Sequence, residues 1–500
     1  MVLNRRRTLA WLLVVVAGLW TVQCGSSDKD HMPITTSSNE AADEFLAGRE
    51  LFENARKPDA RLHFLKAVEL DPEFALAYCF IAFTDFLAYS GLSARGFHDN
   101  LQLAKTHSGH VSQGEQLLIE SALADAGGNP GRQRELLGKL AEMYPKDESV
   151  LFFQAIAYYT QQMYDSSALI CERIVQLAPS YAPPYNSLGY SYRALGNLDA
   201  AARAFQEYTR LIPNDPNPYD SYAELLTRMG RFEEAIEQYR LALKQNPAFG
   251  SSRVGISANL IFLERYDEAR RELAFLRRTA ANAADMRAAL VGIVVSYVDE
   301  GNLSGALVQL EVLYELDASS PDPPSMSGDL SLIAFVLARL GRFEEAKSRL
   351  VRALEVIEHS DLSAQVKRDI RIERIMWLAT LQLEKGKLSE AQTLADRYLS
   401  HLSSSAAPGQ LRNAHLIQGR VALSQGDYDR AITELEQADQ QQAWTLFHLA
   451  KAYEGKGDLS NAGQLYDQAA RSHELNSLYY AFIRREAAGK ADELRQKINL

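Results

Sequence analysis

Residues 182–215 read APPYNSLGYSYRALGNLDAAARAFQEYTRLIPND, and this stretch decides the fold. Apolar and small residues recur at helical spacing on both sides of Gly196, which predicts two helices separated by a tight turn. Glycine tolerates the left-handed backbone conformation that follows a helix, so we expect Gly196 to end the first helix. Pro213 cannot continue a helix and is expected to end the second one.

The same turn recurs along the chain as the motif Gly-x-[Leu/Phe/Tyr]-x-x-Ala. Copies of the motif begin at Gly196, Gly230, Gly301, Gly341, Gly386, Gly426 and Gly457, and a copy at Glu264 lacks only the glycine. The motif alanines Ala201, Ala235 and Ala269 follow one another at a period of 34 residues. One helix pair cannot bury its apolar stripe alone, whereas stacked pairs bury a continuous core. The pattern therefore predicts a stack of helix pairs.

The motif and its period resemble the tetratricopeptide repeat. In the first stretch, the family's signature positions hold Tyr185, Leu188, Gly189, Tyr192, Ala201, Phe205 and Tyr208. The resemblance implies an all-α fold, a right-handed superhelical solenoid of antiparallel helix pairs over residues 41–476. We count about twelve units, which start near residues 41, 75, 114, 148, 182, 216, 250, 287, 327, 372, 412 and 443.

Three parts of the array depart from the regular pattern. The repeats over residues 75–147 are weak, because they keep the apolar spacing and lose the signature residues. The loop at residues 318–326 is a candidate hinge between two halves of the solenoid, and the alternative is a surface loop on a rigid array. Residues 477–500 are rich in Arg, Lys and Glu, which suits the polar outer face of C-terminal capping helices.

Residues 1–23 look like a targeting segment. Three arginines at positions 5–7 precede an uncharged, apolar run over residues 8–22. A helix of that length spans about 22 Å, which is shorter than a bilayer core of about 30 Å, so the run favours a signal peptide. Cys24 follows directly, and the arrangement resembles a bacterial lipoprotein signal in which Cys24 receives the lipid. Thr21 and Gln23 depart from the lipoprotein pattern.

Two alternatives to lipidation remain open, an uncleaved signal anchor and cleavage without a lipid. All three interpretations place the folded chain in the cell envelope, outside the cytoplasm. By the same resemblance, Gly25 points to the outer membrane, on its periplasmic side, if the source is Gram-negative. The polar residues 24–40 are expected to form a flexible tether.

Composition and motifs argue against several classes of function. The chain has 53 Lys and Arg against 64 Asp and Glu, a net charge of −11, which disfavours nucleic acid as a partner. It lacks the phosphate-loop, zinc-protease and nucleophile-elbow motifs, so we expect no enzymatic activity, cofactor or metal.

A few residues could still suggest chemistry. His107 and His110, with His98 and Glu115 nearby, have a metal-like spacing but are expected to be solvated loop residues. The cysteines at positions 79 and 171 are expected to be buried free thiols.

In tetratricopeptide repeats the second, fifth, ninth and twelfth positions of each unit point into a concave groove. By that resemblance, the predicted partner-binding residues are Asn186, Tyr190, Arg193, Asp220, Glu224, Trp444, Phe447 and Lys451. Such a groove suits a peptide or a helix of a partner protein, so the sequence predicts a membrane-tethered scaffold for other envelope proteins. The alternative is recognition of a glycan or another polymer, with the aromatic groove residues stacking on sugar rings.

Overall fold

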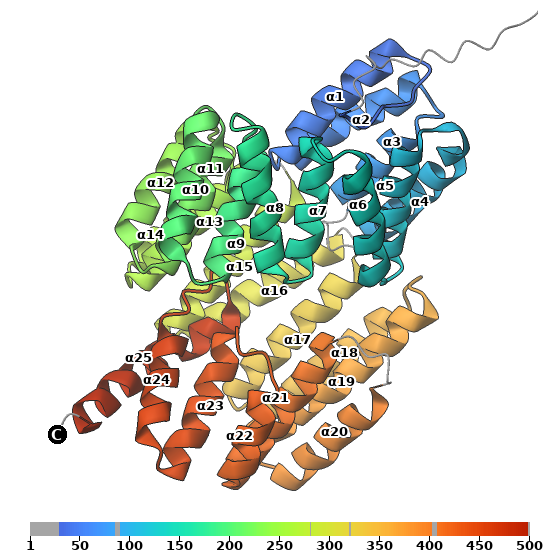
Figure 1. Cartoon of the computed structure of the whole chain (residues 1–500). Coiled ribbons are helices and arrows are strands. Elements are labelled where there is room, and N and C mark those ends of the chain that lie inside the picture. The colour runs from blue at the N-terminus through green and yellow to red at the C-terminus, as the bar shows by residue number, and fades with distance from the viewer. Residues whose placement is uncertain (1–29, 86–90, 281, 320–321, 403–407, 499–500) are drawn as a thin grey trace, which may run out of the picture. The chain divides into compact units, whose positions relative to one another are not determined.

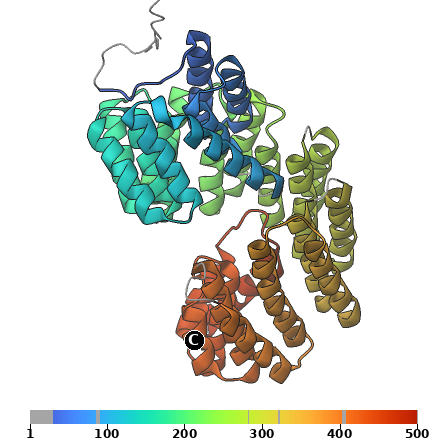
Figure 2. The same ribbon diagram turned by 90° about the vertical axis from the view of Figure 1, so that its right-hand side faces the viewer.

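The computed structural model describes residues 30–85, 91–280, 282–319, 322–402 and 408–498. These residues form α-helices and one short 3₁₀ helix, with no strand among them. Consecutive helices lie side by side as antiparallel pairs in chain order (Figures 1 and 2). The all-α solenoid predicted from the repeats is confirmed. The predicted signal peptide and Cys24 lie outside the described residues.

The chain divides into two compact units, residues 1–85 with 97–150, and residues 86–96 with 151–500. The first unit contains α1 (Asn39–Glu53), α2 (Lys57–Leu70), α3 (Ala75–Asp85), most of α4 (Gly91–His107), η1 (Ser108–His110), α5 (Gln113–Ala126) and α6 (Pro130–Met143). The weak repeats over residues 75–147 therefore form helices like those of the rest of the chain.

The second unit holds most of α7 and all later helices, and among the described helices α25 is left over after the others pair. They are α7 (Glu148–Thr160), α8 (Tyr164–Leu177), α9 (Pro183–Ala194), α10 (Leu198–Leu211), α11 (Pro216–Arg228), α12 (Phe232–Gln245), α13 (Gly250–Phe262), α14 (Tyr266–Thr279), α15 (Ala283–Glu300), α16 (Leu303–Ser319), α17 (Pro323–Arg339), α18 (Phe343–Glu358), α19 (Ala364–Glu384), α20 (Leu388–His401), α21 (Pro408–Gln425), α22 (Tyr428–Glu436), α23 (Ala443–Lys456), α24 (Leu459–Ala470) and α25 (Leu478–Ile498). The described helices thus make twelve pairs and one additional C-terminal helix.

The motif glycines end the first helix of their pairs as expected. Gly196 has a φ of 77° and Gly301 a φ of 89°, and the other five motif glycines are also left-handed. Glu264 occupies the same position in the copy without glycine and takes a φ of 58°. The turn geometry is therefore kept even where a side chain has to bear the strain.

Small residues let the two helices of a pair approach closely. A Cβ atom added to Gly189 on α9 would lie 2.6 Å from the ring of Phe205 on α10. Gly255 on α13 allows the same close approach between neighbouring pairs, because a Cβ atom there would lie 2.2 Å from the ring of Tyr239 on α12. The rings are buried at the contact, so these glycines hold the helices at their separation.

The second half of the predicted N-terminal tether is not a free linker. The backbone N–H of Met32 donates to Asp147 at 2.7 Å, and both the N–H and the hydroxyl of Thr35 donate to Glu115, at 2.8 and 2.6 Å. Glu115 is fully buried. The tether prediction is therefore corrected from Met32 onward, because buried carboxylates on the first unit bind this segment.

Most of the predicted hinge loop at residues 318–326 is helical. Helix α16 ends at Ser319 and α17 begins at Pro323, and residues 320–321 between them lie outside the described residues.

None of the helices that the structure describes is both long enough and apolar enough to cross a bilayer.

The C-terminal segment forms the single helix α25, which does more than cover the end of the array. It packs along α24 and also contacts α15 and α23 (Figures 1 and 2). Its buried side chains are Leu478, Tyr480, Ala481, Ile483, Ala487, Ala491 and Leu494. The last helix of the second unit therefore contacts α15, a helix from the middle of the same unit.

Candidate partner-binding groove

The first helices of the pairs line the inner side of the array in the second unit. First helices of neighbouring pairs contact one another. These contacts join α11 to α13, α17 to α19, α19 to α21, and α21 to α23. No comparable contact joins the second helices of neighbouring pairs in the described part of the chain. The array therefore curves toward its first helices, and their facing side forms a groove.

The structure brings together three predicted groove residues of α9 and α11. Arg193 donates to the Glu224 carboxylate at 3.0 Å and lies over the ring of Tyr190, 4.6 Å from its centroid. The hydroxyl of Tyr190 lies 3.3 Å from the same carboxylate and 3.2 Å from the hydroxyl of Ser221. These groups satisfy one another, so this stretch of groove presents a preformed polar cluster.

Two more predicted residues flank this cluster. Ser252 donates to Asp220 at 2.6 Å, and Asp220 is only 7% exposed. Burial raises the pKa of Asp220 to about 7, although the Ser252 hydrogen bond opposes the shift. The side-chain carbonyl oxygen of Asn186 is buried and has no hydrogen-bond partner in the described residues. The carboxylate of Asp220 and the side-chain oxygen of Asn186 are therefore buried beside the cluster and are not exposed to a partner.

A cavity of about 500 Å³ opens further along the groove, between α19, α21 and α23. Its polar lining includes Glu384, Arg420, Ser424, His448 and Lys451. Arg420 donates to Glu384 at 3.1 Å, and both side chains are largely buried. The cavity therefore has fixed charges of both signs in its wall and an exposed lysine at its edge.

His448 is held in one orientation and one protonation state. Its Nδ1 lies 2.7 Å from the backbone carbonyl of Trp444, and because a carbonyl only accepts, Nδ1 carries the proton. Burial lowers the pKa of His448 well below its usual value, and the nearby charges of Arg420 and Lys451 add to the shift. The imidazole is thus neutral, and its Nε2 carries no proton.

The structure corrects the assignment of two predicted groove residues. Trp444 is 6% exposed and Phe447 is 3% exposed, so neither ring offers a surface to a partner. Trp444 packs against Phe335 of α17 and Tyr479 of α25, with ring centroids 6.2 and 5.4 Å away. The physical reason is α25, which fills this part of the groove. Lys451 stays exposed and lines the cavity.

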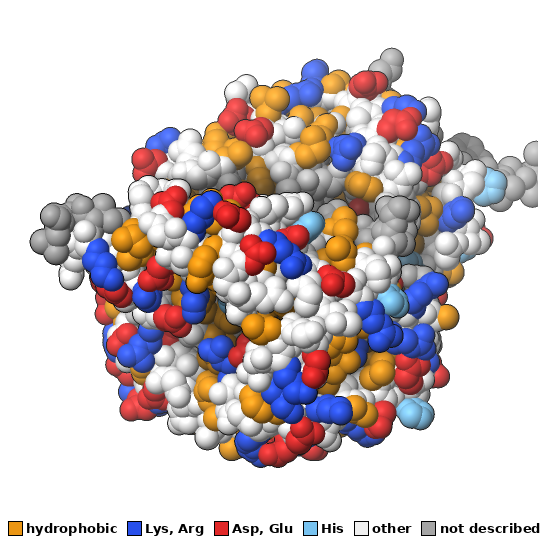
Figure 3. Space-filling view, turned by 90° about the horizontal axis from the view of Figure 1, so that it is seen from below, with side chains coloured by type: hydrophobic (Ala, Val, Ile, Leu, Met, Phe, Trp, Pro, Cys, Tyr) orange, Lys and Arg blue, Asp and Glu red, His pale blue; other side chains and the backbone are white. Residues whose placement is uncertain are grey.

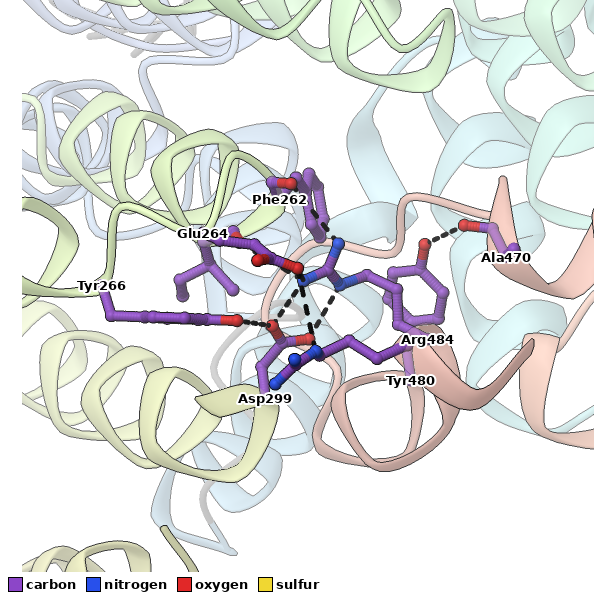
Figure 4. A network of polar contacts seen from close by, with 9 residues as sticks. Phe262, Glu264, Tyr266, Asp299, Ala470, Tyr480 and Arg484 are labelled. Carbon is purple, nitrogen blue, oxygen red and sulfur yellow. Dashed lines mark hydrogen bonds and ion pairs between the residues drawn. The ribbon is translucent and has the colours of Figure 1, made fainter. Parts of the chain in front are cut away.

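A buried polar network fixes α25 in this position (Figure 4). Arg484 of α25 donates two hydrogen bonds to Asp299 of α15, at 2.8 and 2.6 Å. Tyr266 of α14 donates to the same carboxylate at 2.9 Å. The hydroxyl of Tyr480 reaches the carbonyl of Ala470 at the end of α24. The network thus joins the last helices to the middle of the unit.

Sequence reasoning missed Arg420 and His448 as groove residues. Arg420 is the ninth residue of the unit that starts at 412, so the positional rule of the family could have found it. His448 occupies no inward position by that rule, and no sequence signal points to it. Its place in the cavity follows from the packing of α23 against α21.

The other candidates from the sequence have structural roles. Glu115, one of the residues with metal-like spacing, accepts a hydrogen bond from the backbone of Ser112 at 2.9 Å and caps α5. His107 stacks on Tyr78 at 5.8 Å. Cys79 and Cys171 are buried free thiols, as predicted, and burial raises the pKa of Cys171 to about 12.

Comparison with known sequences supports the repeat assignment. Sequence models of the tetratricopeptide repeat match residues 182–215 and 217–249, and also residues 377–446 and 418–477. The TPR repeat-containing protein YpiA of Bacillus subtilis (strain 168) is 20% identical over 374 residues, which cover 73% of this chain and 80% of that protein.

Two solved structures with some similarity to this chain have low TM-scores. A crystal structure of MamA is 18% identical, with a TM-score of 0.28. The alignment covers 33% of this chain and 91% of the MamA chain. A structure of Naa15/Naa10 bound to HypK-THB is 16% identical, with a TM-score of 0.26, over 77% of this chain and 68% of that chain. At these TM-scores the superpositions add nothing to the repeat assignment, which rests on the matched sequence models.

Proposed function

We propose that this chain, a tetratricopeptide-repeat protein, is a non-catalytic scaffold that binds a peptide or helix of a partner protein in the groove along α19, α21 and α23. The observation that carries this proposal is the cavity of about 500 Å³ between these helices. Its wall offers a cation, a carboxylate and a neutral imidazole in fixed positions, which suits the mixed polar groups of a peptide.

The surface of the molecule agrees with a protein partner. On the face shown in Figure 3, Lys and Arg side chains are interspersed with Asp and Glu, and hydrophobic side chains are scattered in small patches. A nucleic acid requires a continuous basic surface instead. Recognition of a glycan has lost support, because Trp444 and Phe447, two of its three proposed stacking platforms, are buried.

We further propose that the protein is tethered to a membrane through a lipid on Cys24 and works in the cell envelope, outside the cytoplasm. The sequence of residues 1–24 supports this proposal. Seven residues, 25–31, separate Cys24 from Met32, and an extended chain of that length spans at most about 25 Å. The first unit would therefore stay close to the membrane surface.

The test is a crosslinking pull-down from native membranes with a tagged full-length chain. Ser424 is exposed in the groove cavity, so Ser424→Trp is expected to block partner binding. The matched control is Ser400→Trp, on the exposed side of the second helix α20. The proposal predicts one defined set of partners for the wild type and the control, and its loss in Ser424→Trp. Equal recovery from all three would refute the groove assignment.

Membrane attachment is tested in the same preparation. Cys24→Ser removes the proposed lipid site and leaves the folded units unchanged. We expect the wild type in the membrane fraction and Cys24→Ser in the soluble fraction. If Cys24→Ser remains in the membrane, the lipid tether is wrong and an uncleaved signal anchor accounts for the attachment.

A further inference from the structure

A second, smaller cavity of about 180 Å³ lies between the first helices α17 and α19. Its lining includes Ser327, Gly328 and Ser331 from α17 and Glu373 and Arg374 from α19. The cavity is separate from the large one described above, since no lining residue is shared. Among its polar groups, the side chain of Arg374 stands out by its hydrogen bonding and its charge.

Arg374 is a buried cation that forms no ion pair within the described part of the chain. Its side chain is almost fully enclosed, with the residue 6% exposed, and it donates to the hydroxyls of Ser331 and Ser327 at 3.2 Å each. Its Nε–H group has no hydrogen-bond partner in the described part of the chain. Burial lowers the pKa of Arg374 to about 10, and the charge of Glu373 opposes this shift only in part.

Comparable arginines of the second unit are paired. Arg484 binds Asp299 at 2.6 Å, Arg420 binds Glu384 at 3.1 Å, and Arg287 binds Asp329 at 2.6 Å. A buried charge is costly unless an opposite charge and hydrogen bonds compensate for it. Arg374 is thus the exception among these four, and it faces an open cavity.

The cavity provides further groups and space for an anion. Ser331 donates its hydroxyl proton to the carbonyl of Ser327 at 2.8 Å, whereas the hydroxyl proton of Ser327 has no acceptor in the described residues. A Cβ atom added to Gly328 would meet no other atom within 4 Å. A group that enters beside Gly328 would therefore meet the guanidinium group of Arg374 and the hydroxyl group of Ser327 in the cavity wall.

We propose that this cavity receives a carboxylate from an acidic side chain of the bound partner segment, held by Arg374 and Ser327. Arginine suits this task, because its hydrogen bonds to a carboxylate are charge-assisted and geometrically specific. The inference rests on the proposed function and adds a chemical requirement to it: the partner segment has an Asp or Glu where it crosses α17 and α19.

Glu373 sets a limit on the strength of this site. It lines the same cavity and acts on Arg374 through its charge, with no ion pair between the two in the described residues. Its negative charge repels an incoming carboxylate. The variant Glu373→Gln is therefore expected to bind an acidic probe several-fold more tightly than the wild type.

The site is tested with a small probe that needs no partner protein. The probe is N-acetylglutamate N-methylamide, and the corresponding glutamine compound is its neutral control. The full-length chain is labelled with ¹⁵N-arginine, and the Nε–H signal of Arg374 is identified by its absence from Arg374→Lys. We expect this signal to shift saturably with the glutamate probe and to stay unchanged with the glutamine probe.

A blocking variant makes this result specific. Gly328→Leu fills the cavity without removing any polar group, and it replaces a glycine inside a helix by a better helix former. We expect it to weaken the glutamate probe at least tenfold. An Arg374 signal that does not respond to the glutamate probe, or responds equally in Gly328→Leu, would overturn the inference.

A stability measurement separates ligand binding from a role in folding. Without probe, Arg374→Met is expected to keep or raise the thermal midpoint, because it removes an uncompensated buried charge. A large fall in the midpoint would show that Arg374 serves the fold, which would contradict the proposal. The probe titration is independent of the pull-down, so failure of this inference and failure of the scaffold proposal are distinguishable.

Discussion

The guanidinium group of Arg484 donates two hydrogen bonds to the carboxylate of Asp299, at 2.8 and 2.6 Å, from a position 185 residues later in the chain. Asp299 is only 3% exposed. In a stack of repeats, each pair usually contacts only its neighbours. This pair of residues instead links the end of the second unit to its middle, and so determines which part of the groove stays open.

Replacing Arg484 tests how much this contact contributes to the stability of the second unit. We expect Arg484→Met to lower the free energy of unfolding by about 3–5 kcal/mol, because it leaves a buried carboxylate without its cation. The neighbouring Arg485 is the control: it lies 3.7 Å from Glu264, and both side chains are 55% exposed. Arg485→Met should cost less than about 1 kcal/mol. Urea unfolding measures both, and equal effects would contradict a closing role for Arg484.

The buried carboxylate of Asp220 should make stability depend on pH. Its pKa is about 7 in the folded chain, raised mainly by burial, so the folded state keeps a proton that the unfolded state loses above about pH 4. Stability from this residue therefore falls as pH rises from about 4 to 7. Asp220→Asn removes the effect.

The measured quantity is the difference in unfolding free energy between Asp220→Asn and the wild type. Between pH 4 and pH 8, the variant should gain at most about 4 kcal/mol of unfolding free energy relative to the wild type. This value corresponds to a shift of about three pKa units. Urea unfolding at both pH values checks this. A difference that does not change with pH would show that Asp220 is ionised in the folded chain.

Close packing at Gly189 predicts a large effect of one methyl group. A Cβ atom there would lie 2.6 Å from the Phe205 ring, so Gly189→Ala should cost about 1–3 kcal/mol through overpacking. Gly328 is also inside a helix of the same unit, but its Cβ position is open. Gly328→Ala should instead stabilise by about 0.5–1 kcal/mol. Thermal unfolding of the two variants should shift in opposite directions.

The left-handed turns predict a second pair of opposite effects. Gly341 has a φ of 75° with no atom near its Cβ position, so Gly341→Ala adds only backbone strain, about 1 kcal/mol. Gln162 takes a φ of 60° in the corresponding turn between α7 and α8. Gln162→Gly should therefore raise stability by up to about 1 kcal/mol. Loss of stability in Gln162→Gly would mean that its side chain contributes more than its backbone costs.

Features that depend on neighbouring residues could be predicted from the sequence. The glycine turns and the order of the helix pairs follow from a short motif that recurs along the chain, together with the spacing of apolar residues where the motif is absent. The contact of Tyr190 and Arg193 with Glu224 could also be expected, because the first helices of adjacent units place equivalent positions side by side.

Features that depend on the whole array could not be predicted. The curvature of many successive pairs decides whether α25 reaches α15, and no single repeat encodes it. For this reason Trp444 and Phe447 were predicted in the groove and are found in the core. The binding of Met32 to Asp147 likewise joins segments 115 positions apart in a part of the chain without repeat signatures.

The central claim is that the groove along α19, α21 and α23 binds a partner protein. Its most direct test is a photoreactive residue in place of Ser424, on the groove cavity, compared with one in place of Ser400, on α20. After irradiation of native membranes, the crosslinked peptides are identified by mass spectrometry. We expect Ser424 to yield one recurring segment of one partner, and Ser400 not to yield it. The same products from both positions, or none from Ser424, would contradict the claim.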